Sequence, residues 1–167
     1  IQNSSHLILP GVGSFPAAMK KILSKIDTQL LYENLQAKKP FLGICVGMQV
    51  LASIGNEFES TKGLDLMEES IVDRIVTVQT LPHIGWNSVK FEQHSELFDG
   101  MSSGLDFYFL HSFIFTSIRK EFIIGSTDYD VKFPSAIRKE NVYGVQFHPE
   151  KSQSAGEKLL ANFLKIK

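Results

Sequence analysis

LILPGVG (residues 7–13) and FLGICVG (residues 41–47) decide the fold, because each runs from a short apolar segment into a glycine-containing turn. Apolar segments without alternation are typical of strands buried on both faces of a parallel sheet. Between them, from Ala17 to about Leu35, apolar residues recur at the three- and four-residue spacing of one helical face, and Pro40 marks the end of that helix. Strand, helix and strand joined by short turns predict an α/β fold with a parallel sheet.

The remaining segments predict the rest of the architecture. We expect strands over 6–10 and 41–44, a helix over 46–55 that ends at Gly55, strand segments over 70–78, 87–91, 106–115, 122–129 and 134–148, and a closing helix over 155–166. The later strand segments are separated by turns such as KEN, so they indicate antiparallel strands added to the parallel sheet. No repeat or flexible linker interrupts the chain, and we expect residues 1–167 to form a single domain.

Composition and charge exclude several classes of function. The formal net charge of −1, without runs of lysine or arginine, argues against a surface for nucleic acid. No segment approaches the roughly 18 consecutive apolar residues of a membrane span. The single cysteine cannot form an internal disulfide, which favours a reducing, cytoplasmic location. No cluster has metal-ligand spacing and no phosphate-cradling loop with its lysine is present, so we expect neither metal nor cofactor.

The single cysteine, Cys45, stands between two glycines at the junction of a predicted strand and helix. Gly43-x-Cys45-x-Gly47 has the form of a nucleophile elbow, in which small neighbours allow a turn sharp enough to display the sulfur above the sheet edge. We expect the N-terminus of the following helix to lower the pKa of the thiol. A buried, inert cysteine explains the motif equally well when it is taken alone.

A base for this thiol comes from VQFHPEKS (residues 145–152). His148 follows an apolar strand and lies at its carboxyl end, the edge at which α/β active sites assemble. Pro149 keeps the chain extended, so His148 and Glu150 project to the same side. Glu150 can then orient the imidazole, and Cys45, His148 and Glu150 together predict a catalytic triad.

Two further features complete the predicted site. The turn PGVG (residues 10–13) follows the first strand and can aim backbone N–H groups at an oxyanion, with the amide of Val46 as a second donor. An ordinary strand-to-helix turn is the alternative. Gln49 lies one helical turn beyond Cys45 and is placed to bond a substrate held over the thiol.

LILPGVGSF, FLGICVGMQVL and YGVQFHPEKS, in this order, resemble the class I (triad-type) glutamine amidotransferases. LPHIGWN (residues 81–87) and FYFLHSF (residues 107–113) are similar to the glutaminase subunits of imidazole glycerol phosphate synthases. The resemblance implies a flavodoxin-like three-layer α/β sandwich with a mostly parallel central sheet and an added antiparallel region. It also implies hydrolysis of glutamine through a cysteine thioester. The ammonia would pass to a (β/α)₈-barrel cyclase subunit, which makes imidazole glycerol phosphate and the purine-pathway by-product AICAR in histidine biosynthesis.

The resemblance also assigns roles to individual residues. It implies Cys45, His148 and Glu150 as the triad, the backbone of Val12, Gly13 and Val46 as oxyanion donors, Gly13, Gln49, Ser112 and Phe113 as the glutamine site, and Trp86 and Lys151 as contacts with the cyclase. The residues alone would make Trp86 a core aromatic and Lys151 a surface charge.

The chain departs from this family at its start, because the family begins with a further strand, helix and strand that we expect to be missing here. Three other functions stay open. A paralogous amidotransferase subunit would supply ammonia to a synthetase that modifies surface sugars. A cysteine hydrolase of peptides or esters would use the same elbow, and a catalytically silent interaction subunit would keep only the fold.

Overall fold

Two parallel strands carry the stretches that predict the fold. In the computed structural model, which describes residues 4–167, β1 (Leu7–Gly11) pairs in parallel with β2 (Phe41–Cys45), and Gly11 lies opposite Cys45. On its other side β2 pairs in parallel with β11 (Val142–Val145). Every residue of β2 is buried, as expected for a strand in the interior of a parallel sheet. The expected burial of both faces is wrong for β1, which lies at the edge of the sheet and leaves Ile8 45% exposed. The carboxyl ends of the three strands therefore meet at one edge.

Beyond β11 the sheet becomes antiparallel. It has seven strands in the order β1-β2-β11-β10-β9-β6-β7. Its antiparallel strands are β10 (Val131–Lys139), β9 (Ile123–Tyr129), β6 (His83–Phe91) and β7 (Leu105–His111). A second, four-stranded sheet has the order β4-β3-β5-β8 and consists of β4 (Glu59–Lys62), β3 (Ala52–Glu57), β5 (Met67–Arg74) and β8 (Phe113–Ser117). The added antiparallel region is thus confirmed, and because it is larger than the parallel part, the central sheet is mixed and not mostly parallel as expected.

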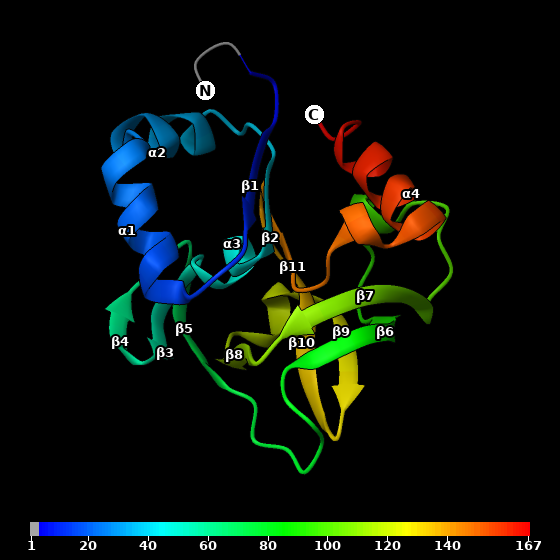
Figure 1. The fold of residues 1–167 in the computed structure, drawn as a ribbon. Helices are drawn as coiled ribbons and strands as arrows, with labels where there is room; N and C mark the ends of the chain where they lie inside the picture. The colour runs from blue at the N-terminus through cyan, green and yellow to red at the C-terminus, as the bar shows by residue number, and fades with distance from the viewer. Residues whose placement is uncertain (1–3) are drawn as a thin grey trace.

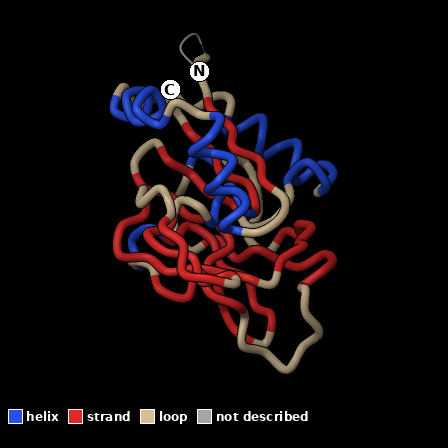
Figure 2. Tube along the Cα trace, turned by 60° about the vertical axis from the view of Figure 1, so that its left-hand side comes forward, coloured by secondary structure: helices blue, strands red, loops and turns tan. Residues whose placement is uncertain are grey.

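The helices lie on both sides of the parallel strands (Figure 1). The α-helices are α1 (Phe15–Lys25), α2 (Thr28–Gln36), α3 (Val46–Gln49) and α4 (Gln153–Phe163). Three short 3₁₀ turns are η1 (Glu96–Phe98), η2 (Lys120–Phe122) and η3 (Pro149–Lys151). α1 and α2 lie on one side and α4 on the other, which is the predicted three-layer α/β arrangement. Figure 2 shows most of the antiparallel strands gathered below the helices.

One hydrophobic core joins these layers. Fully buried aromatic side chains come from both sheets and from helices on both sides: Phe15, Phe107, Phe115, Phe147 and Phe163. Burying each ring stabilises the fold by roughly 1.5–3 kcal/mol. Residues 1–3 of the predicted single domain lie outside the described residues, and the expectation of a missing strand-helix-strand stays a prediction. Within residues 4–167, no helix is long and apolar enough to cross a membrane.

The helix predicted from Ala17 to about Leu35 is wrong as a single helix. Ile26 has an extended backbone (φ −111°, ψ 128°) and ends α1. Asp27 then caps α2, since its Oδ1 accepts a hydrogen bond from the amide of Leu30 at 3.1 Å. Aspartate is among the preferred N-cap residues, so a strong local start signal divides one apolar periodicity into two helices.

The helix predicted over 46–55 is also wrong after its first turn. α3 ends at Gln49, and the chain continues as β3, which pairs with β4 and β5. Gly55 is a strand residue and no helix cap. A Cβ at Gly55 would lie 2.4 Å from the ring of Phe15, so glycine lets α1 pack directly on β3. Pairing in the second sheet overrides the local helical pattern.

The segment predicted as one strand over 106–115 is divided in the structure. β7 ends at His111 and β8 begins at Phe113, and the two strands belong to different sheets. Similarly, the segment over 134–148 forms the end of β10, a turn and β11. The residue at the first break, Ser112, therefore lies between the two sheets.

The cap of α2 gives a prediction. Asp27→Ala removes the acceptor for the amide of Leu30 and should lower the free energy of unfolding by about 1 kcal/mol, measured by urea denaturation. Asp27→Asn keeps a side-chain acceptor and should stay within a few tenths of a kcal/mol of the unmodified protein. Equal stability of all three proteins would contradict the role of Asp27 as a cap.

Candidate active site

A cavity of about 200 Å³ opens at the edge where β1, β2 and β11 end. Most of the residues predicted for the site line it: Val12, Gly13, Cys45, Val46, Gln49, Ser112, Phe113 and His148. They come from the ends of three parallel strands, from α3 and from the junction of β7 and β8. The fold thus brings together residues that are up to 136 positions apart in the chain (148 − 12).

The turn at Cys45 has the sharp geometry that the sequence predicts. Cys45 has a φ of 55° and a ψ of −114°, a strained conformation for a residue with a side chain. The neighbouring glycines are required by close packing. A Cβ at Gly47 would lie 1.9 Å from the carbonyl oxygen of Leu9, and a Cβ at Gly43 would lie 2.4 Å from the carbonyl oxygen of Gly47. Larger residues at either position would push α3 away from β1.

The thiol of Cys45 is buried and uncharged in this structure. Its sulfur lies 3.8 Å from the carbonyl oxygen of Leu110 and 3.8 Å from Nε2 of Gln146, which donates to it. Burial raises the pKa of the thiol to about 11. The amide of Val46 lowers that pKa by a smaller amount, and the Glu150 carboxylate raises it. The expected lowering of the pKa by a helix N-terminus is therefore wrong, because α3 is a single turn and desolvation outweighs its effect.

His148 and Glu150 form the predicted pair, but the expected extended chain between them is wrong: only His148 is extended, and Pro149–Lys151 form the 3₁₀ turn η3. His148 Nδ1 lies 2.7 Å from Glu150 Oε1. Because a carboxylate only accepts, Nδ1 carries the proton and Nε2 is left as the basic nitrogen. Nε2 is buried and has no hydrogen-bond partner among residues 4–167. It is therefore not hydrogen-bonded to the thiol of Cys45. His148 and Cys45 thus line the same cavity, and the imidazole keeps an acceptor nitrogen that no described residue uses.

One backbone hydrogen bond and the hydroxyl of Ser152 hold the His148 segment against β7. The amide of His148 donates to the carbonyl of Tyr108 at 2.8 Å. The hydroxyl of Ser152 donates to the carbonyl of His148 at 2.6 Å and accepts from the amide of Tyr108 at 3.0 Å. Three bonds thus fix the position of the imidazole relative to the sheet.

Gln49 lies deep in the cavity wall. It is only 3% exposed, and its Nε2 donates to the carbonyl oxygen of Phe113 at 3.0 Å and to Oε1 of Gln146 at 3.1 Å. Val12 lies at the opposite extreme, with 77% of its surface exposed, and the adjacent Gly13 has a φ of 106° that favours glycine. The predicted oxyanion turn therefore forms the open side of the cavity.

Sequence reasoning missed several residues at this site. The cavity is also lined by Glu57, Pro82, Leu110 and His111, and Gln146 bonds the thiol. Glu57 ends β3 and brings a carboxylate to the wall, where its Oε2 also accepts from the amide of Phe15 at 2.7 Å. The predicted helix over 46–55 ended two residues before Glu57, so no strand was expected to carry this residue to the site. The alternation of Ala52 and Ile54 with the polar Ser53 is the only local signal that could have indicated a strand there.

The two residues predicted to contact a partner share one surface. Trp86 is 48% exposed on β6 and meets the ring of Tyr108 edge-on, with the ring centroids 6.1 Å apart. The Nζ of Lys151 lies 5.8 Å from the centre of the same Tyr108 ring. Trp86 is therefore no core residue. Trp86 and Lys151 are exposed and Tyr108 between them is partly buried; this group lies beside the His148 segment, and we call it the Trp86 surface.

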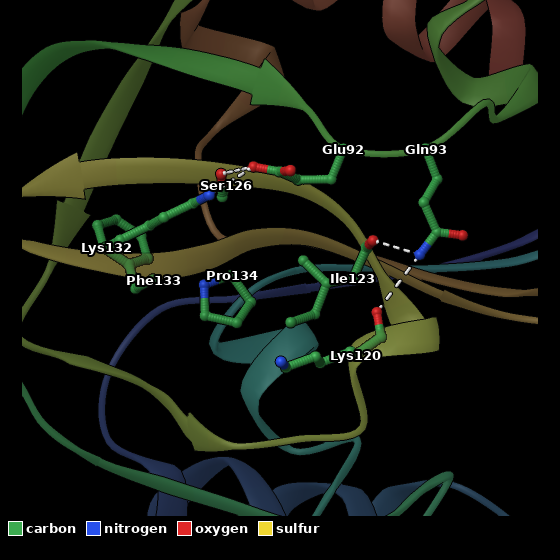
Figure 3. A pocket seen from close by; sticks show the side chains of 8 residues that line it. All are labelled: Glu92, Gln93, Lys120, Ile123, Ser126, Lys132, Phe133 and Pro134. Atoms are coloured by element: carbon green, nitrogen blue, oxygen red, sulfur yellow. Dashed lines mark hydrogen bonds and ion pairs between the residues drawn. The ribbon is translucent and has the colours of Figure 1, made fainter.

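A second cavity, of about 420 Å³, lies over β9 and β10 (Figure 3). Figure 3 shows Glu92 and Lys132 on its wall, where they form an ion pair of 2.8 Å, and Ser126 beside them. It has no cysteine or histidine in its lining. The groups needed for nucleophilic chemistry are therefore found in the first cavity.

Comparisons with known proteins agree on one family. The family model described as glutamine amidotransferase class-I matches residues 1–166. A protein named imidazole glycerol phosphate synthase subunit HisH from Desulfitobacterium hafniense is 44% identical over 157 residues, which are 94% of this chain and 74% of that protein. A protein of the same name from Methanocaldococcus jannaschii is 41% identical over 160 residues, 96% of this chain and 80% of that protein.

Solved structures show the same fold at low sequence identity. A glutamine amidotransferase from Thermotoga maritima superposes with a TM-score of 0.67 at 21% identity, over 98% of this chain and 64% of that one. Another glutamine amidotransferase superposes with a TM-score of 0.71 at 18% identity, over 96% and 78% of the two chains. These neighbours confirm the flavodoxin-like fold class. Together with the match over nearly its whole length, they show that the chain belongs to the class I glutamine amidotransferases.

Proposed function

We propose that this chain is the glutaminase subunit of an imidazole glycerol phosphate synthase and that Cys45, His148 and Glu150 carry out its chemistry. The observation that carries the proposal is one cavity lined both by a cysteine on a strained turn and by a histidine whose Nε2 is unpaired. The names of relatives that are more than 40% identical support the choice of pathway, which is histidine biosynthesis.

The reaction follows from the positions of these groups. His148 Nε2 takes the proton of the thiol as Cys45 Sγ attacks the carboxamide carbon of glutamine. Backbone N–H groups of Val12 or Gly13 and of Val46 stabilise the oxyanion. His148 then gives its proton to the departing nitrogen, which leaves as ammonia, and a γ-glutamyl thioester remains on Cys45. Water, deprotonated by the same Nε2, hydrolyses the thioester to glutamate and restores the thiol.

The charge state of Cys45 supports low activity in the isolated subunit. With a pKa raised to about 11, almost no thiolate is present near pH 7, and the sulfur bonds Leu110 and Gln146 instead of the imidazole. A small movement of the sulfur or of His148 must join the two groups before catalysis. We propose that docking of the synthase partner favours this arrangement, so that glutamine is hydrolysed only when ammonia can be used.

Glu57 supplies a group that glutamine recognition requires. The substrate carries an α-ammonium group, and Glu57 is the one carboxylate in the lining of the cavity among the described residues. One of its oxygens bonds the amide of Phe15, which fixes the side chain and leaves the other oxygen for the substrate. A charge-assisted hydrogen bond of this kind would discriminate glutamine from simple amides.

The Trp86 surface is the proposed docking site for the cyclase, a (β/α)₈ barrel, in a cytoplasmic heterodimer. It joins an exposed aromatic side chain to a lysine directly beside the catalytic histidine segment. Aromatic residues are enriched at the centres of protein interfaces. A synthetase that modifies surface sugars remains the second candidate partner, and purified cyclase and synthetase compared as activators of glutamate release would separate the two.

Removal of the nucleophile is the first test. Cys45→Ala should reduce glutamate release by the assembled enzyme to the rate without enzyme, since no thioester can form. Ser24→Ala, on the exposed face of α1, is the control and should leave the rate unchanged. Unchanged hydrolysis in Cys45→Ala would support the catalytically silent alternative.

The second prediction concerns Glu57. Glu57→Gln removes the negative charge opposite the α-ammonium group and should raise the KM for glutamine at least about tenfold, with kcat nearly unchanged, because the interaction is equally strong in substrate and transition state. Glu59→Gln, an exposed residue on β4, should leave both constants unchanged. A fall in kcat alone would place Glu57 elsewhere in the mechanism.

The raised pKa of Cys45 predicts a pH effect on stability. The folded thiol loses its proton near pH 11, whereas the thiol of the unfolded chain loses it near pH 9. Below pH 8 both states are protonated and the contribution of this group is constant. Between pH 9 and 11 only the unfolded state ionises, so stability falls by about 1.4 kcal/mol per pH unit.

Cys45→Ser provides the reference for this effect, because serine does not titrate in that range. The difference in unfolding free energy between the unmodified protein and Cys45→Ser should be flat from pH 6 to 8 and decline from pH 9 to 11. A constant difference up to pH 11 would show that the thiol is not held in its neutral form.

A further inference from the structure

Two histidines beside the cavity form a buried pair that the proposed mechanism does not use. His83 begins β6 and His111 ends β7 directly opposite it. They are 3% and 6% exposed, and Nδ1 of His83 lies 3.0 Å from Nε2 of His111. Aromatic rings enclose the pair. Phe109 and Tyr129 stack on His83, and Phe133 meets His111 edge-on.

The partners of the pair fix which nitrogen carries each proton. His111 Nδ1 lies 3.1 Å from the carbonyl oxygen of Phe113, which only accepts, so this nitrogen is protonated. His111 Nε2 then accepts from Nδ1 of His83. His83 Nε2 in turn accepts from Nδ2 of Asn87 at 3.3 Å, and the amide of Asn87 is oriented by a second bond from Nδ2 to the carbonyl of Asp128. The hydrogen bonds run in one direction from Asn87 to Phe113.

Burial keeps both rings in this neutral form. It lowers the pKa of His83 to about 4 and the pKa of His111 to about 3, with the neighbouring His83 adding to the effect on His111. A proton added to His111 Nε2 would also face the N–H of His83 and break the central bond. The order of protons is therefore stable throughout the neutral pH range.

The carbonyl of Phe113, which ends the series of hydrogen bonds from Asn87, also orients Gln49. Gln49 Nε2 donates one hydrogen to the oxygen of Phe113 and the other to Oε1 of Gln146. Both amide hydrogens are thus used, and Gln49 retains only Oε1 for a ligand in the cavity that it lines. A reversed amide would place Oε1 of Gln49 against the carbonyl oxygen of Phe113, two acceptors without a hydrogen between them.

We propose that His83 and His111 are positioning residues of the glutaminase site: they hold the Phe113 carbonyl, and this carbonyl turns the oxygen of Gln49 toward an N–H group of bound glutamine. The inference rests on the proposed function and deepens it, because it names what sets the polarity of the substrate site. Loss of the pair weakens recognition of glutamine and leaves the reactivity of Cys45 unchanged.

Two reagents that alkylate Cys45 separate recognition from thiol reactivity. The diazoketone analogue of glutamine must be recognised as an amino acid before it transfers its carbon to sulfur and releases dinitrogen. Iodoacetamide transfers its carbon to sulfur and releases iodide, and it has no amino-acid portion. The ratio of the two labelling rates of Cys45 therefore measures recognition.

The variants are made in the full-length protein. His111→Leu removes the donor to the carbonyl of Phe113. His111→Asn restores a donor, because the side-chain nitrogen of asparagine can occupy the position of the imidazole Nδ1. We expect diazoketone labelling to slow at least about tenfold in His111→Leu and less than about threefold in His111→Asn. Iodoacetamide labelling at pH 9 should stay within about twofold in both. In the assembled enzyme His111→Leu should raise the KM for glutamine by the same factor and leave kcat within about twofold.

Tyr129→Leu is the packing control. It removes the ring stacked on His83 and none of the hydrogen bonds of the pair, so both labelling rates should match the unmodified protein. If His111→Leu slows both reagents equally, the pair has only a structural role and the inference is overturned. If the unmodified protein reacts with iodoacetamide but never with the diazoketone, the proposed function itself fails and the inference fails with it.

A measurement on the unmodified protein covers the case in which His111→Leu does not fold. Nuclear magnetic resonance of isotope-labelled histidine distinguishes protonated from unprotonated ring nitrogens. We expect His83 and His111 each to be protonated at Nδ1 and unprotonated at Nε2. Detection of a proton on Nε2 of either ring at neutral pH would overturn the proton order and the inference.

Discussion

The sharp turn at Cys45 is the constraint on which the rest of the site depends. Its positive φ costs on the order of 1–3 kcal/mol and places the sulfur above the end of β2. The turn exists because Gly47 lets α3 lie against the carbonyl of Leu9. Parallel pairing then sets Gly11 opposite Cys45 and β11 on the other side of β2, so that the loop after β1 and His148 arrive at the same edge.

The same packing that builds the site also restrains it. A thiol in a buried, carbonyl-lined position stays protonated, and the imidazole that would deprotonate it is held by Glu150 but not bonded to the sulfur. Free ammonia would be protonated and lost in bulk water, so an amidotransferase gains from an inactive resting site. The Trp86 surface lies next to the His148 segment, and in the proposed function a partner docked there changes the distance between His148 and Cys45.

The sequence was sufficient for the parallel strands and for the residues at their ends, because buried strands and glycine turns leave strong local patterns. It was insufficient where distant segments decide the structure. The residues after Gln49 read as a helix, yet pairing with β5 makes them a strand and delivers Glu57 to the cavity. The pair of His83 and His111 depends on the register of β6 and β7, which no local pattern encodes. Burial of Cys45 likewise reversed the expected pKa shift.

The most direct test of the account is to trap the thioester. The assembled enzyme is quenched with acid during glutamine turnover, and its peptides are analysed by mass spectrometry. The peptide containing Cys45 should carry one γ-glutamyl group, which hydroxylamine removes, and this group should be absent before glutamine is added. Steady glutamate release with no modification of Cys45, or with the group on another residue, would contradict it.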